Sequence, residues 1–252
     1  MRFRGRDFDG SGVCVAVVDS GINPEDPRLT TAQVEGWALT MDATGHACVG
    51  ADTDDVHGHG TEVAAVLHRR APGARLLGIR VADADFQTTA ELIAAGVESA
   101  CREGASIINV SMGAADPGRA RVLQESCARV RALGSVVVAA SHPDGRASFP
   151  ADLPQAVGVL SHPDCQERLF HLAAHRFPPA EFAHISGKFV APGYAAPNGE
   201  GDPAYLGSGI AAAEFSAWLA CIAEAQPHEG VDVWLETLRH LALVPDPEFG
   251  YA

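Results

Sequence analysis

Runs of apolar, often β-branched residues alternate along the chain with longer segments whose apolar positions recur at helical spacing. The continuous apolar runs are typical of strands that are buried on both faces, and they cover residues 13–18, 76–81, 105–113, 136–140 and 156–160. The helical spacing is found at residues 88–102, 119–133 and 231–241. Because strands and helices of this length alternate, right-handed crossovers should build a parallel sheet. We therefore expect an α/β fold with three layers, in which helices cover both faces of a mostly parallel central sheet.

The most apolar segment of the chain begins at Gly207 and Ser208 and continues to Ala225. Its large apolar residues fall on every side of a helix, which is the pattern of a helix that is buried all round. The start of such a helix presents unpaired backbone N–H groups and the positive end of the helix dipole, where an anion or an oxygen nucleophile is favoured. We therefore expect the functional site to include the start of this helix.

The composition narrows the range of functions. The chain has 252 residues, of which 47% are hydrophobic, and this is enough for one core in a single domain spanning residues 1–252. The formal net charge of -14 argues against nucleic acid and anionic membranes as partners, because both bind basic surfaces. No long apolar segment follows the basic residues 1–6, so we predict neither a signal peptide nor a membrane span and expect a cytoplasmic protein.

Three polar motifs lie where the predicted elements meet. Asp19 ends the first predicted strand in the sequence Asp-Ser-Gly-Ile-Asn, and in open α/β sheets this edge carries the ligand crevice. His59 begins the sequence His-Gly-Thr-Glu-Val-Ala at a loop-to-helix junction, and residues 207–213 read Gly-Ser-Gly-Ile-Ala-Ala-Ala at the start of the apolar helix. In this order, the motifs resemble those of the subtilisin-like serine proteases, or subtilases. The resemblance runs from roughly residue 12 to residue 225 and implies a three-layer subtilisin-like fold.

The resemblance assigns roles to these residues and also shows two departures. It implies that His59 is a general base oriented by Asp19. The family's nucleophilic serine aligns with Gly209, which has no side chain, and its oxyanion asparagine aligns with Pro143, which offers neither an amide nor a backbone donor. In a subtilisin, losing the serine costs about a millionfold in turnover and losing the oxyanion donor about a hundred- to a thousandfold. We therefore expect no ordinary serine-protease chemistry.

A peptide-binding groove is also implied by the resemblance. One wall is the family's substrate-pairing strand, which aligns with Ser111, Met112 and Gly113. The other wall precedes the oxyanion loop and aligns with Ala139, Ala140 and Ser141. Because backbone pairing needs no nucleophile, such a groove can hold a peptide without cutting it. We predict a pseudoprotease that binds an extended peptide or protein segment, such as a precursor peptide or a partner enzyme in a biosynthetic pathway.

The sequence leaves alternatives open. An active peptidase or peptide-modifying hydrolase would use Asp19, His59 and Ser208. The Ser208 hydroxyl would approach His59 if the loop register shifted by one residue. The competing reading of Ser208 is an N-cap, because a small residue before a helix is commonly one. Alternatively, the Asp19–His59 pair is a relic, or the chain is a scaffold whose own loops fill the cleft.

The sequence gives little evidence for a metal site or for disulfides. His57, His59 and Glu62 form a candidate zinc site beside Asp19, but the two histidines flank a glycine in a loop. The 6 cysteines lie mostly within predicted strands and helices and form no Cys-x-x-Cys pair, which favours reduced core residues over disulfides or a zinc site. We predict no metal and no other cofactor.

Overall fold

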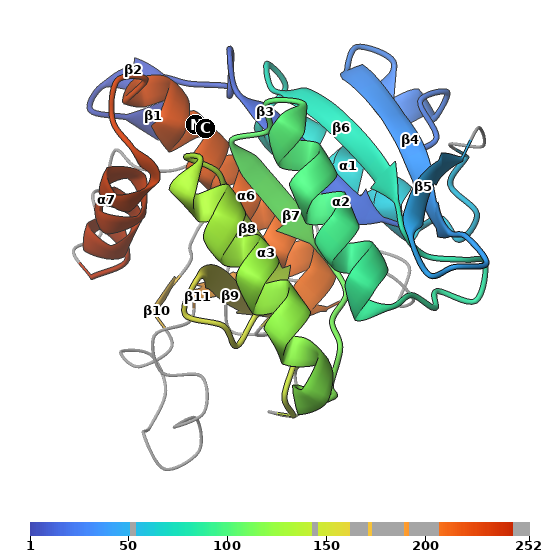
Figure 1. Cartoon of the computed structure of the whole chain (residues 1–252). Coiled ribbons are helices and arrows are strands. Elements are labelled where there is room, and N and C mark those ends of the chain that lie inside the picture. The colour runs from blue at the N-terminus through green and yellow to red at the C-terminus, as the bar shows by residue number, and fades with distance from the viewer. Residues whose placement is uncertain (51–53, 143–145, 162–170, 173–188, 192–206, 244–252) are drawn as a thin grey trace.

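A computed structural model describes residues 1–50, 54–142, 146–161, 171–172, 189–191 and 207–243 (Figure 1). Its strands are β1 (Arg2–Phe3), β2 (Arg6–Asp7), β3 (Cys14–Asp19), β4 (Gln33–Met41), β5 (Ala47–Gly50), β6 (Arg75–Arg80), β7 (Ile107–Val110), β8 (Val136–Ala140), β9 (Ala156–Ser161), β10 (His171–Leu172) and β11 (Phe189–Ala191). Its α-helices are α1 (His59–Arg70), α2 (Ala90–Arg102), α3 (Ala120–Ala132), α6 (Ser208–Ala225) and α7 (Val231–Leu243). Two short 3-10 helices lie at Pro27–Leu29 and Pro117–Arg119.

Within the described residues, nine strands form one sheet in the order β10-β11-β9-β8-β7-β3-β6-β4-β5. The seven strands from β11 to β4 pair in parallel, while β10 and β5 pair antiparallel at the two edges. β1 and β2 form a separate hairpin. The expected mostly parallel α/β sheet is confirmed, and its parallel order brings the carboxyl ends of β3, β7 and β8 to one edge.

Helices cover both faces of this sheet, with α2 and α3 on the near face of Figure 1 and α1 and α6 behind it. The side chains of β3 show why. Val15 and Val17 join the core beneath α1 and α6, whereas Ala16 and Val18 join the core beneath α2 and α3. Because successive side chains of a strand point to opposite faces, a strand that is apolar at every position requires both helical layers.

The helix α6 is the buried centre of the larger core. Apart from Gly209 and the last two residues, Glu224 and Ala225, every residue of α6 is buried. It packs against α1, α7 and the strands β7, β8 and β9. The prediction of a helix buried all round is confirmed, and this burial fixes the position of its first turn relative to the carboxyl ends of the strands.

The α2 helix begins after Thr89, whose hydroxyl accepts a hydrogen bond from the Leu92 N–H as an N-cap does. The buried thiols of Cys127 and Cys221 have pKa values raised to about 12 by burial, as expected for core residues. Cys48, in contrast, is exposed on the edge strand β5. Within residues 165–203, the structure describes only the residues of β10 and β11. None of the described helices combines the length and the apolar composition that crossing a bilayer requires.

Candidate active site

The structure brings Asp19 and His59 into direct contact. Asp19 is the last residue of β3 and is fully buried, and His59 is the first residue of α1. The His59 Nδ1 atom lies 3.0 Å from both carboxylate oxygens of Asp19. Because a carboxylate can only accept, this contact places the proton on Nδ1 and leaves Nε2 as the acceptor of the neutral ring. Asp19 Oδ1 also accepts a hydrogen bond from the Ser20 N–H, which fixes the carboxylate.

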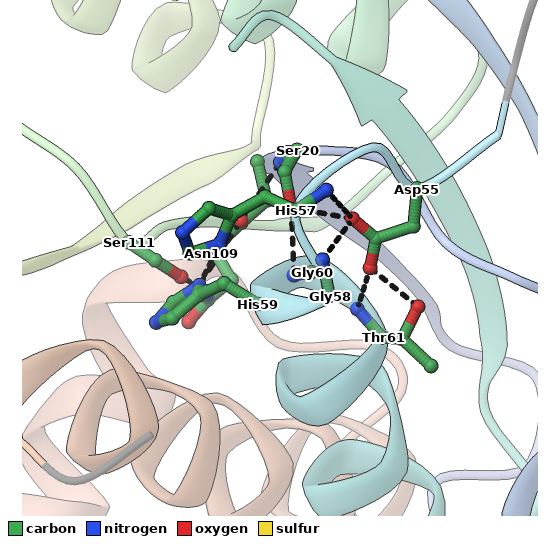
Figure 2. A network of polar contacts seen from close by, with 10 residues as sticks. Ser20, Asp55, His57, Gly58, His59, Gly60, Thr61, Asn109 and Ser111 are labelled. Carbon is green, nitrogen blue, oxygen red and sulfur yellow. Dashed lines mark hydrogen bonds and ion pairs between the residues drawn. The ribbon is translucent and has the colours of Figure 1, made fainter. Parts of the chain in front are cut away.

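A second carboxylate, Asp55, holds the loop that precedes His59 (Figure 2). Its oxygens accept hydrogen bonds from the Ser20 and Thr61 hydroxyls at 2.7 and 2.5 Å. They also accept from the N–H groups of His57, Gly58 and Thr61 at 2.8 to 3.1 Å. A negative charge is favoured at the amino end of a helix, where N–H groups lack intrahelical partners. Asp55 therefore anchors the start of α1, and with it the His59 backbone.

A close approach between two segments completes this anchor. The Gly60 N–H donates to the Ser20 Oγ at 3.0 Å, and a Cβ atom at Gly60 would lie only 2.0 Å from the Gly21 carbonyl oxygen. No side chain fits at that distance, so glycine is required for α1 to begin against the loop after β3. The two segments that carry Asp19 and His59 are thus held in contact by backbone packing as well as by the ion pair.

The surroundings shift the pKa values of both His59 and Asp55. Burial opposes a charged imidazole at His59, but the charge and hydrogen bond of Asp19, aided by Asp55 and Glu62, outweigh it and raise the pKa of His59. Burial would raise the pKa of Asp55, yet the hydrogen bonds donated by Thr61, Gly58 and Ser20 outweigh burial and lower it. The site therefore favours a charged Asp55 and a protonated His59 more strongly than water does.

Gly209, in the first turn of α6, faces the imidazole of His59. A Cβ atom built on Gly209 would lie 3.0 Å from both Cε1 and Nε2 of His59 and 3.3 Å from the Ser111 Cβ. Gly209 therefore occupies the place from which a side chain would reach Nε2. Ser208 precedes it, and its Oγ lies 3.3 Å from the Ser161 N–H, whose hydrogen bond it accepts. The N-cap of α6 is Gly207, so Ser208 does not cap the helix.

A buried chain of hydrogen bonds runs beneath this site from α6 to the segment after β7. The Ser216 hydroxyl donates to Asn109 Oδ1 at 3.1 Å, and Asn109 Nδ2 donates to the Ser111 Oγ at 3.0 Å. Ser216 and Asn109 are fully buried. The Ser111 hydroxyl thus accepts a hydrogen bond from within the protein. Figure 2 shows Ser111 next to the imidazole of His59.

The predicted groove walls lie at the carboxyl ends of neighbouring strands. Ser111, Met112 and Gly113 follow β7, while Ala139 and Ala140 end β8 and Ser141 follows it. The segment is paired just beyond Gly113, where Ala114 and Phe149 exchange two hydrogen bonds of 2.9 Å. Gly113 packs on the protein itself, because a Cβ atom there would lie 2.6 Å from the Ser148 Oγ. Pro143, the predicted oxyanion position, lies outside the described residues.

The candidate metal ligands make other contacts. Glu62 forms an ion pair with Arg28 at 2.6 Å. The His57 ring packs against the Phe86 ring, with centroids 4.7 Å apart. In the part of the chain that the structure describes, no group of three or more His, Cys, Asp or Glu side chains is arranged to hold a metal ion.

Sequence reasoning missed three residues that shape the site. Asp55 was visible only as one member of an acidic loop, although a carboxylate a few residues before a helix is a recognisable capping signal. Asn109 lies inside an apolar strand run, where a polar residue is itself a signal that a buried partner exists. Phe86 gave no signal, because its contacts with His57 and His59 join segments that are distant in sequence.

Comparisons with known proteins agree with this geometry. The sequence matches the model of the Subtilase family over residues 10–244. Thermitase of Thermoactinomyces vulgaris is 30% identical over 166 residues, which are 61% of this chain and 56% of Thermitase, so little more than half of that relative is matched.

Solved structures extend the comparison over more of the fold. A cold adapted subtilisin-like serine proteinase superposes with a TM-score of 0.71 at 18% identity, covering 93% of this chain and 83% of that chain. The prenylagaramide maturation protease PagA superposes with a TM-score of 0.60 at 22% identity, covering 85% of this chain and 76% of that chain. At these identities the superpositions establish the fold alone. The family match, in contrast, spans most of the sequence: this chain belongs to the subtilase family.

Proposed function

We propose that this chain is a catalytically degenerate subtilase that binds an extended peptide or protein segment without cutting it. The observation that carries the proposal is the position of Gly209. A Cβ atom there would lie 3.0 Å from Nε2 of His59, the nitrogen that takes the proton from the nucleophile in a Ser-His-Asp triad. A glycine at this place provides no hydroxyl to attack a carbonyl carbon.

The neighbouring hydroxyls do not replace the missing nucleophile. The Ser208 hydroxyl accepts a hydrogen bond from the Ser161 N–H, so a one-residue shift of register would have to break that contact and move the start of a buried helix. The Ser111 hydroxyl accepts from Asn109 and belongs to a buried network. The contact between Asp19 and His59 persists, and a protonated His59 is suited to donate a hydrogen bond to a bound peptide carbonyl.

The partner that we propose is a peptide segment in extended conformation. Ser111 and Ser141 follow the carboxyl ends of the parallel strands β7 and β8, and extended segments of this kind can pair with a peptide backbone largely independently of its sequence. One solved structure with this fold is a peptide maturation protease, PagA. This likeness favours a precursor peptide, or an enzyme that acts on one, as the partner.

Two assays test the proposal. The first treats the protein with a fluorophosphonate probe and with unfolded casein. Neither labelling nor cleavage is expected, and either result would refute the proposed function.

The second measures binding of fluorescein-labelled, non-cleaved casein fragments by anisotropy. Ser111→Phe adds bulk beside Gly209 and should weaken binding at least about tenfold, or 1.4 kcal/mol. Ser111→Ala removes only the hydroxyl and should have a much smaller effect; equal binding by all three proteins would place the peptide elsewhere.

A further inference from the structure

Phe86 lies against the imidazole of His59 on the loop that joins β6 to α2. The ring centroids of the two residues are 4.9 Å apart, with an interplanar angle of 55°. The same phenyl ring contacts His57, with centroids 4.7 Å apart. Phe86 is half-buried and also packs against the core beneath α2. A single aromatic side chain therefore joins the two histidines that flank Gly58 to the rigid part of the fold.

The backbone of this loop is held in a conformation that is unfavourable for phenylalanine. Phe86 has a φ of 58°, in the left-handed region that residues other than glycine rarely occupy. Hydrogen bonds from the Phe86 N–H to the Asp83 carbonyl and from the Gln87 N–H to the Asp83 carboxylate, at 3.0 and 2.8 Å, fix this turn. A non-glycine residue retained in such a conformation points to a use for its side chain.

The contacts of His59 indicate what that use is. Asp19 holds Nδ1, and Gly209 closes on the Cε1 and Nε2 edge without offering a side chain. In a complete triad the nucleophile would add a contact at that edge. Here the phenyl ring of Phe86 supplies a contact to the imidazole that does not depend on a nucleophile.

The geometry points to Phe86 as a positioning residue that holds the His59 imidazole in place and stabilises its protonated form through the aromatic ring. A cation within about 6 Å of an aromatic centroid is attracted by the ring quadrupole. Asp19 on β3, Asp55 in the preceding loop and Glu62 on α1 also act on His59, and His57 packs against the same phenyl ring, while α6 presents no acidic residue in its first turn.

The inference deepens the proposed function, because it rests on a His59 that binds rather than catalyses. Its test requires no peptide, so its failure is distinct from a failure of peptide binding. The test follows the titration of His59 by NMR in histidine-labelled protein, with the His59 signals identified by their loss in His59→Gln. Phe86→Leu keeps an apolar cover of similar size and removes only the aromatic ring, so desolvation changes little.

The expected result is that Phe86→Leu lowers the pKa of His59 by about half a pH unit, whereas Phe86→Tyr leaves it near the wild-type value. Phe8→Leu is the matched control, because Phe8 packs on Phe3 with centroids 6.5 Å apart and is outside the site. An unchanged titration in Phe86→Leu, or an equal fall in Phe86→Tyr, would overturn the proposal. If the leucine variant fails to fold, nuclear Overhauser contacts between the Phe86 ring and the His59 ring in the wild-type protein decide the matter, and their absence refutes it.

Discussion

Gly209 approaches the imidazole of His59 so closely that a Cβ atom on it would lie 3.0 Å from both Cε1 and Nε2. The contact joins the first turn of the buried helix α6 to the first residue of α1, and both positions are fixed by the packing of these helices on one face of the sheet. Asp19 holds the opposite edge of the same ring. An Asp–His pair is therefore present, and a glycine lies at the place from which a side chain would reach Nε2 of the imidazole.

Restoring a serine at this position should not restore a protease. In Gly209→Ser, the new Cβ would force the His59 ring to move by a few tenths of an ångström against Asp19 and Phe86. Pro143, which aligns with the family's oxyanion asparagine, also remains proline, and loss of that donor alone costs about a hundred- to a thousandfold in a subtilisin. Fluorophosphonate labelling and casein hydrolysis by Gly209→Ser should therefore stay near background, and addition of Pro143→Asn should raise both.

Gly209→Ala is the matched control for this prediction, because it adds the Cβ without the hydroxyl. It should show the structural response of His59 but no labelling at all. Rapid hydrolysis by Gly209→Ser alone would mean that another group provides the oxyanion donor.

Replacing Asp19 with asparagine should reverse the pKa shift of His59. Burial lowers this pKa and the Asp19 charge is the largest influence that raises it, so Asp19→Asn should leave burial dominant and bring the pKa below its ordinary value of 6.5. NMR titration of the ring measures this directly. A pKa that stays raised in the variant would assign the effect to Asp55 and Glu62 instead.

Asp19→Asn should also change how the stability of the folded protein depends on pH. A group whose pKa is raised on folding contributes stability that is fully present below its unfolded pKa and is lost as the pH rises through the folded pKa. The wild-type protein should therefore lose the stability contributed by His59 as the pH rises above about 6.5. The Asp19→Asn variant should not show this loss. Urea unfolding between pH 5 and pH 9 measures the difference.

Asp55 should contribute both to the stability of the fold and to the position of His59. Asp55→Ala removes the acceptor for five donors, three of which are backbone N–H groups just before or within the first turn of α1. We expect a loss of about 3 kcal/mol in the free energy of unfolding and broadening of the His59 signals. Because the pKa of Asp55 is lowered on folding, its contribution is present above the unfolded value of 3.8 and is lost as the pH falls through the folded value.

Asp42→Ala provides the comparison for Asp55. Asp42 also accepts from backbone N–H groups and a threonine hydroxyl, but it lies in the exposed turn between β4 and β5, and its donors, Thr44 and His46, belong to that same turn. Its removal should have a much smaller effect on unfolding and none on the His59 signals. Equal losses in the two variants would show that Asp55 stabilises only its own loop.

Much of the fold could be predicted because the local sequence of a strand or helix reflects how much of it is buried. A strand buried on both faces is apolar at every position, so β3, β8 and β9 were evident, and the all-apolar α6 was evident for the same reason. The β4–β5 hairpin was not predicted, because its mixed burial gives no clear alternation and Gly36 interrupts it. Gly36 is there because a Cβ atom would lie 2.3 Å from the Gly78 carbonyl oxygen on the neighbouring strand, a contact between distant residues.

The same distinction applies to the site. Asp19, His59 and Gly209 lie in short ordered motifs, so their meeting could be predicted from the resemblance. The contacts of Phe86 with His59 and of Asn109 with Ser216 depend on how loops and helices meet across the sheet. No spacing along the chain encodes these contacts, so they became visible only in the folded structure.

A buried ion pair between the two central helices provides the last prediction. Glu214 on α6 is 1% exposed and lies 2.9 Å from Arg69 Nη2 and 2.8 Å from Arg70 Nε on α1. Burial raises the pKa of Glu214 against the opposing effect of the two arginines. Glu214→Ala leaves two partly buried guanidinium groups without this carboxylate and should lower the free energy of unfolding by about 3 kcal/mol.

Glu214→Gln keeps a hydrogen-bond acceptor but is neutral, so it should cost less stability than Glu214→Ala. It should also remove the decline in stability that the raised pKa of Glu214 predicts as the pH rises above 4.5. Glu125→Ala, which breaks an exposed pair with Arg121, should change stability by no more than about 0.5 kcal/mol in the same urea titrations. A loss in Glu214→Ala as small as that of the exposed pair would mean that apolar packing alone holds α1 against α6.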